Sequence, residues 1–132
     1  MNYSITLSVR DYECDAQGIL NNAVYMNYME HCRHEFLKNI LKLSFVELHA
    51  QGIDLVLKTS TIDYKASLKS GDDCQVTLTV AMEGRLRCRF NQEIIRKSDQ
   101  KVVVTAVNDV VCLTHGRPSV FEPVIGWLAT QG

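Results

Sequence analysis

The sequence lacks the long apolar runs and the secretory features of membrane and exported proteins. None of its apolar stretches approaches the roughly 20 residues that a helix needs to cross a bilayer. Residues 1–15 alternate and soon meet charge, without the basic segment and apolar core of a signal peptide. The five cysteines are odd in number and form no CxxC pair, which argues against a disulfide framework or a four-cysteine zinc site. We therefore expect reduced thiols and a cytoplasmic location.

Charge of one sign is also scarce, because 14 basic and 15 acidic side chains leave a formal net charge of −1. Such a chain has no global field that attracts nucleic acid or an anionic membrane. Phosphate-binding loops, dinucleotide fingerprints, G-x-S-x-G elbows and HEXXH zinc motifs are missing as well. His31 and His34 are spaced to face one metal from a helix, but no third or fourth ligand follows at a suitable spacing. We expect no metal, no cofactor and no nucleic-acid partner.

The hydrophobic pattern that is present predicts a single domain over residues 1–132. Residues 3–10 alternate as a strand does, and residues 11–21 are predicted to be a loop. A long helix is predicted over 22–42, with Asn21 or Asn22 as its N-cap. The apolar stripe of this helix, at spacings of three and four, comprises Tyr25, Tyr28, Met29, Cys32, Phe36 and Ile40.

Strands dominate the rest of the chain. A short helix or turn is predicted over 44–51, and a short helix near the C-terminus. The predicted strands cover residues 53–64, 73–82, 85–96 and 101–114. Because their connections are short, neighbouring strands are expected to be antiparallel. The predicted architecture is α+β, with one long helix packed on an antiparallel sheet of about five strands.

The stretch DAQGILNNAVY, residues 15–25, resembles a known family. An aspartate, a glycine three residues on, an apolar pair and N-x-x-Y entering a long helix form a pattern similar to the hot-dog-fold thioesterases of the 4-hydroxybenzoyl-CoA thioesterase type. Within that group, VRDY, NNAVY, NY and RHEFL look most like plant plastidial acyl-lipid (acyl-ACP) thioesterases. The resemblance implies a hot-dog fold, with the helix on a strongly curved sheet, and a homodimer or homotetramer.

Thioester hydrolysis needs a group that attacks or activates water, and donors for the developing oxyanion. A helix N-terminus offers unpaired N–H groups and a positive dipole end. The resemblance implies that Asp15 is the nucleophile or general base and that the backbone N–H of Asn22 is an oxyanion donor. The residues alone do not separate the two routes for Asp15. Gly18 is expected to let the loop turn tightly and the substrate approach its backbone.

Other residues of the predicted helix are candidates for the pocket. Tyr25 is expected in the core or at the pocket wall, where it contacts substrate. Some branches of the fold use a helix glutamate as the catalytic acid, but the Asp15 motif is complete, so Glu30 is predicted to be a supporting residue. Met26 and Met29 are candidates to line an adaptable apolar pocket between helix and sheet.

The segment RLRCRF places Arg85, Arg87 and Arg89 at alternate positions of a predicted strand, so that all three point to one face. Forked guanidinium donors suit phosphate. Coenzyme A and the acyl-carrier-protein arm both carry phosphate, so Arg85 and Arg87 are predicted to bind the carrier end of the substrate. The alternative is a solvated strand face. Weaker candidates for the same role are Lys65, Lys69 and Arg117.

The sequence therefore predicts an acyl thioesterase that acts on an acyl-CoA or acyl-ACP with a fatty or β-keto acyl group. An aromatic acyl-CoA is the alternative substrate. A non-catalytic acyl-thioester binding module is an alternative of another class, because one fold hosts many functions. The intact Asp15 motif argues against it. A hydratase is also disfavoured, since it needs a histidine close to its aspartate and none follows Asp15 before His31.

Overall fold

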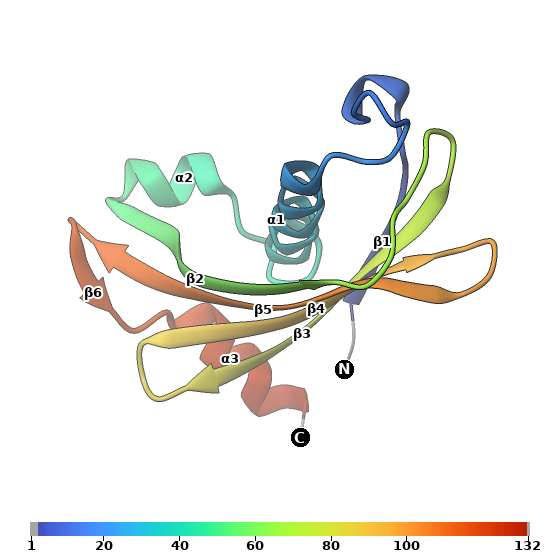
Figure 1. The fold of residues 1–132 in the computed structure, drawn as a ribbon. Coiled ribbons are helices and arrows are strands. Elements are labelled where there is room, and N and C mark those ends of the chain that lie inside the picture. The colour runs from blue at the N-terminus through green and yellow to red at the C-terminus, as the bar shows by residue number, and fades with distance from the viewer. Residues whose placement is uncertain (1–2, 132) are drawn as a thin grey trace.

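The computed structural model describes residues 3–131, in which a curved antiparallel sheet wraps around a long helix (Figure 1). The long helix, α1, spans Asn22–Asn39 and lies on the concave side of the sheet. Two shorter helices, α2 (Phe45–Ala50) and α3 (Glu122–Gln131), follow later in the chain. The single 3₁₀ turn among the described residues, η1, covers Asp11–Glu13.

The sheet has the spatial order β1-β3-β4-β5-β2, and every neighbouring pair is antiparallel. A short sixth strand, β6, pairs with the end of β5. The strands are β1 (Tyr3–Ser8), β2 (Ile53–Tyr64), β3 (Asp73–Glu83), β4 (Arg87–Arg96), β5 (Lys101–Thr114) and β6 (Arg117–Ser119). The predicted strands over 53–64 and 101–114 have the observed bounds. The predicted α+β architecture is also confirmed.

The core lies between α1 and the concave face of the sheet. Every second side chain is buried over residues 74–78 of β3 and 88–94 of β4, as expected for strands with one covered face. The predicted helix stripe meets these residues, and Phe36 packs edge-to-face on Phe90 of β4 and on Trp127 of α3. One contiguous hydrophobic cluster therefore joins all three helices to the sheet.

Several boundaries differ from the prediction by one to three residues, among them the end of α1 and the start of β4. The helix α1 ends at Asn39, three residues before the predicted end, and the left-handed Lys42 (φ 57°) lies in the connection to α2. The strand β4 begins at Arg87, because Gly84 (φ 69°) starts a turn that also contains Arg85 and Leu86. The prediction that Arg85 continues an alternating strand face is therefore wrong.

None of the helices in the described part of the chain is long and apolar enough to cross a membrane. The five cysteines are unpaired, and four of them are buried. Burial raises the pKa of Cys74 and Cys88 to about 11, so these thiols remain protonated core residues.

Candidate functional site

The segment before α1 forms a tight hairpin that carries Asp15 at its tip. The N–H of Asn21 donates to the carbonyl of Glu13 at 3.0 Å, and Cys14 pairs with Leu20 as an antiparallel bridge. At the tip, the N–H of Asp15 donates to the carbonyl of Ile19 at 2.9 Å. This ladder joins Asp15 rigidly to the residues that start the helix.

The carboxylate of Asp15 is exposed, and only one of its two oxygens accepts hydrogen bonds from the described residues. Its Oδ1 accepts from the N–H of Gln17 at 2.8 Å and from that of Ile19 at 3.4 Å. No hydrogen bond to Oδ2 occurs among residues 3–131. The loop therefore fixes one carboxylate oxygen and leaves the other for water or substrate.

Gly18 closes the hairpin with φ +80°, a conformation that strains any residue with a Cβ. Its N–H donates to the carbonyl of Asp15 at 3.0 Å. A Cβ at this position meets no atom within 4 Å, so the requirement for glycine is conformational and the backbone is open to approach from outside.

The start of α1 presents an unpaired amide. Asn21 is the N-cap, and its side chain accepts from the N–H of Ala23 at 3.2 Å. The N–H of Val24 donates to the Asn21 carbonyl at 2.9 Å. The N–H of Asn22, the first helical residue, has no partner within the described chain. It combines a free donor with the positive end of the helix dipole, which is the property that an oxyanion site requires.

Glu13 and Tyr28 hold the hairpin against α1. The Tyr28 hydroxyl donates to Oε1 of Glu13 at 2.7 Å, and the same oxygen accepts the N–H of Arg10 at 2.9 Å. Burial and the adjacent carboxylate raise the pKa of Tyr28, which keeps the hydroxyl a donor. Sequence reasoning missed Glu13. The available signal was a tyrosine on a buried helix stripe, because its hydroxyl needs a polar partner.

Tyr25 lies in the core, one of the two locations predicted for it. It is 1% exposed, and its hydroxyl accepts the N–H of Leu68 at 2.9 Å. The carbonyl of Leu68 in turn accepts the N–H of Leu20 at 2.8 Å, and Lys69 pairs with Ile19 as a bridge. Tyr25 thus positions the segment that flanks the Asp15 hairpin, and burial raises its pKa.

Arg87 and Arg89 lie together on the convex face of the sheet and share one carboxylate. Arg89 donates through Nε and Nη2 to Asp109 at 2.9 and 3.1 Å, and Arg87 donates to it at 3.2 Å. Asp109 is 2% exposed, and its hydrogen bonds with Arg89 lower its pKa. Arg85 lies in the preceding turn and is exposed to solvent.

The arginines and Asp15 lie at opposite ends of β4. The Asp15 hairpin adjoins Leu68, and the neighbouring Ser67 carbonyl accepts from Arg96 at the far end of the strand. The nine-residue rise from Arg87 to Arg96 amounts to about 30 Å. Near the arginines is an open hollow of about 610 Å³ lined in part by Lys58, Glu83, Arg85 and Arg87.

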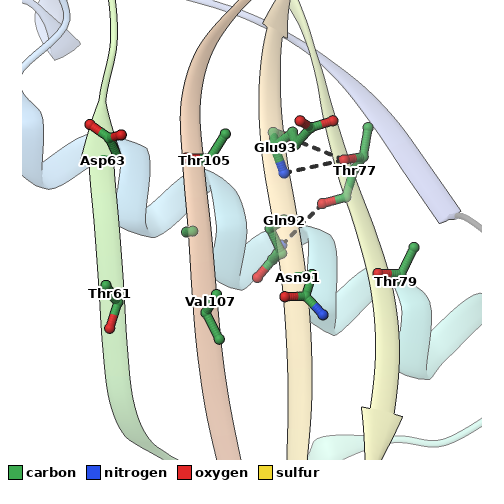
Figure 2. A pocket seen from close by; sticks show the side chains of 10 residues that line it. Thr61, Asp63, Thr77, Thr79, Asn91, Gln92, Glu93, Thr105 and Val107 are labelled. Carbon is green, nitrogen blue, oxygen red and sulfur yellow. Dashed lines mark hydrogen bonds between the residues drawn. The ribbon is translucent and has the colours of Figure 1, made fainter.

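A second hollow, of about 390 Å³, lies on the sheet face away from α1. Figure 2 shows its lining side chains in front of the strands, with α1 behind them. Four of its ten lining residues are threonines, and Thr77 is hydrogen-bonded to the backbone of Glu93. Neither Asp15 nor Asn22 contributes to it. Among the described residues no group of three histidine, cysteine or acidic side chains is placed to hold a metal.

Comparisons with known proteins find relatives that match most of the chain. The chain is 34% identical over 113 residues to the acyl-acyl carrier protein thioesterase ATL3 of Arabidopsis thaliana, a chloroplastic protein, covering 86% of this chain and 59% of that protein. It is 30% identical over 115 residues to a putative esterase of Aquifex aeolicus, covering 87% of each. The chain thus spans less than two thirds of the plant relative and most of the bacterial one.

The fold has solved counterparts. The crystal structure of a 1,4-dihydroxy-2-naphthoyl-CoA thioesterase from Synechocystis superposes with a TM-score of 0.88 at 19% identity, covering 95% of this chain and 93% of that one. This likeness confirms the hot-dog fold. The family model of the "Thioesterase-like superfamily" matches residues 9–127, from the residue after β1 to α3. The chain therefore belongs to the thioesterase-like superfamily.

Proposed function

We propose that the chain hydrolyses acyl thioesters, with Asp15 and the N–H of Asn22 as its reactive groups. One observation carries this proposal. A single hairpin holds together a carboxylate with one oxygen free of hydrogen bonds and a helix-start amide that also has no partner among the described residues. Membership of the thioesterase-like superfamily and the likeness to ATL3 support the same activity.

In the general-base route, Asp15 takes a proton from water while the water oxygen bonds to the thioester carbonyl carbon. The carbonyl electron pair moves to its oxygen, where the Asn22 N–H and the helix dipole stabilise the negative charge. Collapse of this intermediate breaks the carbon–sulfur bond, and the thiolate recovers the proton from Asp15. The products are a free acid and a free thiol.

In the nucleophilic route, the Oδ2 atom of Asp15 itself attacks the carbonyl carbon and the thiolate leaves, which forms a mixed anhydride that water then cleaves. The two routes differ in the origin of the oxygen. A single turnover in ¹⁸O-labelled water introduces label into the product acid in the general-base route. In the nucleophilic route, with water attacking the aspartyl carbonyl, the first product carries unlabelled oxygen and Asp15 acquires the label.

The proposed substrate is a fatty or β-keto acyl group on coenzyme A or on acyl-carrier protein. The support is the 34% identity to ATL3, whose name assigns it acyl-acyl carrier protein as substrate. An aromatic acyl-CoA is tested in the same assay, because the Synechocystis protein, which shares the fold, acts on one.

The unpaired cysteines are consistent with the predicted cytoplasmic location.

We also propose that the protein works as a homodimer joined through β2, with a homotetramer as the larger form. β2 is an edge strand of 12 residues, and its outer edge has no partner strand within the described residues. Long open edges pair with another strand or aggregate. The end of β2 also adjoins the site, since the Tyr64 hydroxyl donates to the carbonyl of Asn22 at 3.3 Å.

Such a dimer bears on the proposed role of Arg85 and Arg87. Within one chain they are about 30 Å from the Asp15 end of β4. Antiparallel pairing of two β2 strands reverses the second sheet, so that its arginine end approaches the first chain's Asp15 end. We therefore propose that Arg85 and Arg87 bind the phosphates of a substrate held in the other subunit's site.

Free-thiol release by the purified chain tests the proposed activity. Hydrolysis of acyl-CoA or acyl-ACP that disappears in Asp15→Asn supports it. Tight binding of acyl thioesters without thiol release would instead identify a binding module.

A further inference from the structure

A small cavity lies between α1 and the sheet, well away from Asp15. Its volume is about 50 Å³, enough for a few heavy atoms rather than for a whole acyl chain. Three polar residues of α1 border it: Glu30, Arg33 and His34. The other walls are apolar and come from α1, α2 and three strands: Leu37, Phe45, Leu55, Leu57, Phe90 and Val110.

Arg33 is the unusual member of this lining. It is 6% exposed, and it makes one hydrogen bond, from Nη1 to the neutral amide oxygen of Gln92 at 2.9 Å. It forms no ion pair with any described carboxylate. Guanidinium has five N–H donors. No buried side-chain nitrogen or oxygen of the described residues lacks a hydrogen-bond partner, so the unused donors of Arg33 face accessible space. Burial lowers the pKa of Arg33. The site has donors that the fold itself does not use.

The neighbouring polar network does not require Arg33. The Oε1 atom of Gln92 also accepts from Asn108 Nδ2 at 2.9 Å, and Gln92 Nε2 donates to the Met29 carbonyl at 3.1 Å. Ser60 completes the chain by donating to Asn108 at 2.6 Å. These contacts link α1 to β4, β5 and β2 without a charge. A structural role for Arg33 in satisfying Gln92 is therefore redundant.

The chemistry of the cavity selects a neutral oxygen rather than an anion. Glu30 borders the same space and its charge opposes a ligand carboxylate. Burial lowers the pKa of His34, whose ring packs on Phe45 with centroids 4.3 Å apart, so His34 adds no positive charge at neutral pH. A hydroxyl accepts from Arg33 and donates to Glu30, and a keto oxygen accepts from Arg33 alone.

Spacing along α1 connects this cavity with the helix start. Asn22, Met26, Glu30, Arg33 and Leu37 follow one another at intervals of four or three and share one helix face. Met26 offers an apolar surface there, since it is 38% exposed. The rise from Asn22 to Arg33 is about 16 Å. A chain whose thioester carbonyl binds at Asn22 and which follows this face brings its remote carbons, not its first ones, to Arg33.

We propose that Arg33 and Glu30 select acyl chains that carry a hydroxyl or keto oxygen at a position remote from the thioester. This inference rests on the proposed function for the anchoring of the chain. Arg33 is then a specificity determinant, and the apolar walls accommodate the carbons around the oxygen. The cavity's small volume limits the selected group to the oxygen and its immediate neighbours.

The test compares acyl-CoAs of one chain length that differ only in the position of a single hydroxyl. The measured quantity is the ratio of kcat/KM for each hydroxylated ester to that for the unsubstituted one. The ratio is expected to peak at one remote position. In Arg33→Met this peak ratio is expected to fall about tenfold, as for the loss of one charge-assisted hydrogen bond. Lys38→Met, which also replaces a cation by methionine but on the exposed side of α1, should keep the ratio of the unmodified protein.

Glu30→Met provides a second variant that leaves Arg33 in place. It is expected to reduce the preference for a hydroxyl over a keto group at the same position, because only the hydroxyl donates to Glu30. A ratio without any peak, or a peak that survives in folded Arg33→Met, would overturn the inference while hydrolysis of the unsubstituted ester upholds the proposed function.

If no ester is hydrolysed, the proposed activity on CoA esters fails separately, and calorimetry with free fatty acids tests the cavity. Tighter binding of the hydroxylated than of the plain acid, lost in Arg33→Met, supports the site. Equal binding of the two acids contradicts it.

Discussion

The two ends of β4 hold polar groups in opposite states. At the Arg96 end, the Asp15 hairpin leaves one carboxylate oxygen and the Asn22 amide without partners among the described residues. At the Arg87 end, Arg87 and Arg89 converge on the buried Asp109, and Arg89 also contacts Glu83 at 3.2 Å. Both ends carry residues typical of active sites, but Arg87 and Arg89 are already paired with carboxylates, whereas the groups at the first end are not.

The difference shows why residue type alone is a poor guide to function. An arginine row and a loop aspartate are both plausible site residues from sequence. The structure distinguishes them by what else they contact, since a group already paired must lose that pairing before it binds a ligand. At the arginine end, Arg85 lies in the turn and forms no ion pair with a described carboxylate, unlike Arg87 and Arg89.

The largest expected effect is at Asp15. Asp15→Asn keeps the side-chain oxygen that the hairpin amides bind but removes the charge that attacks or activates water. We expect kcat/KM for acyl thioesters to fall about 100-fold or more, the usual scale for a lost catalytic acid–base group. Thiol release measures it. Asp11→Asn, an exposed acid four residues earlier, is the matched control and should retain activity.

The next effect is expected at Asp109, on stability rather than on turnover. Asp109→Asn leaves two guanidinium groups facing a neutral amide, and the free energy of unfolding should fall by about 2 kcal/mol. Urea unfolding measures it. Because Arg89 and Arg87 lower the pKa of Asp109, its contribution is complete above the ordinary aspartate value and is lost as the pH falls through the lowered one. A variant with the same acid sensitivity as the original protein would show that the pair is not stabilising.

Gly18→Ala should have a smaller effect on kcat/KM, and comparison with Gly71→Ala distinguishes backbone strain from a role in the site. Gly18 (φ +80°) and Gly71 (φ +85°) both lie in turns where a Cβ meets nothing within 4 Å. Alanine at either position should cost about 1 kcal/mol of stability, because both conformations are left-handed. Only Gly18→Ala is expected to lower kcat/KM as well, since it distorts the Asp15 hairpin. Equal kinetics in the two variants would remove Gly18 from the site.

The smallest effect is expected from the arginines. Replacing Arg85 and Arg87 together by methionine should raise KM for acyl-CoA about fivefold, the scale of partly exposed charge contacts. The KM for a short acyl thioester without the nucleotide should change little. A similar rise for both substrates would contradict a role in binding the carrier end.

The sequence predicted the elements around the site well because their signals are local. Asn21 and the three-and-four spacing of the helix stripe define the start of α1, and the spacing of Asp15, Gly18 and Asn22 resembles one family pattern. The hot-dog fold and superfamily membership are confirmed by the comparisons. The roles of Asp15 and Asn22 stay predictions that the variants above test.

Other features depend on contacts between distant residues, which a single sequence does not reveal. The Glu13–Tyr28 bond joins residues 15 positions apart, and the Arg89–Asp109 pair joins residues 20 apart. The burial of Arg33 against Gln92 spans 59 positions and contradicts the usual exposure of arginine. The spacing of Arg85 predicts a strand, but Gly84 makes that segment a turn.

The most direct test of the central claim is thiol release by the purified protein, with Asp15→Asn alongside, across saturated, β-keto and aromatic acyl-CoAs and the corresponding acyl-ACPs. The account predicts hydrolysis of at least one fatty or β-keto ester and its loss in the folded variant. Hydrolysis that continues unchanged in Asp15→Asn, or no thiol release from any of these esters, would contradict it.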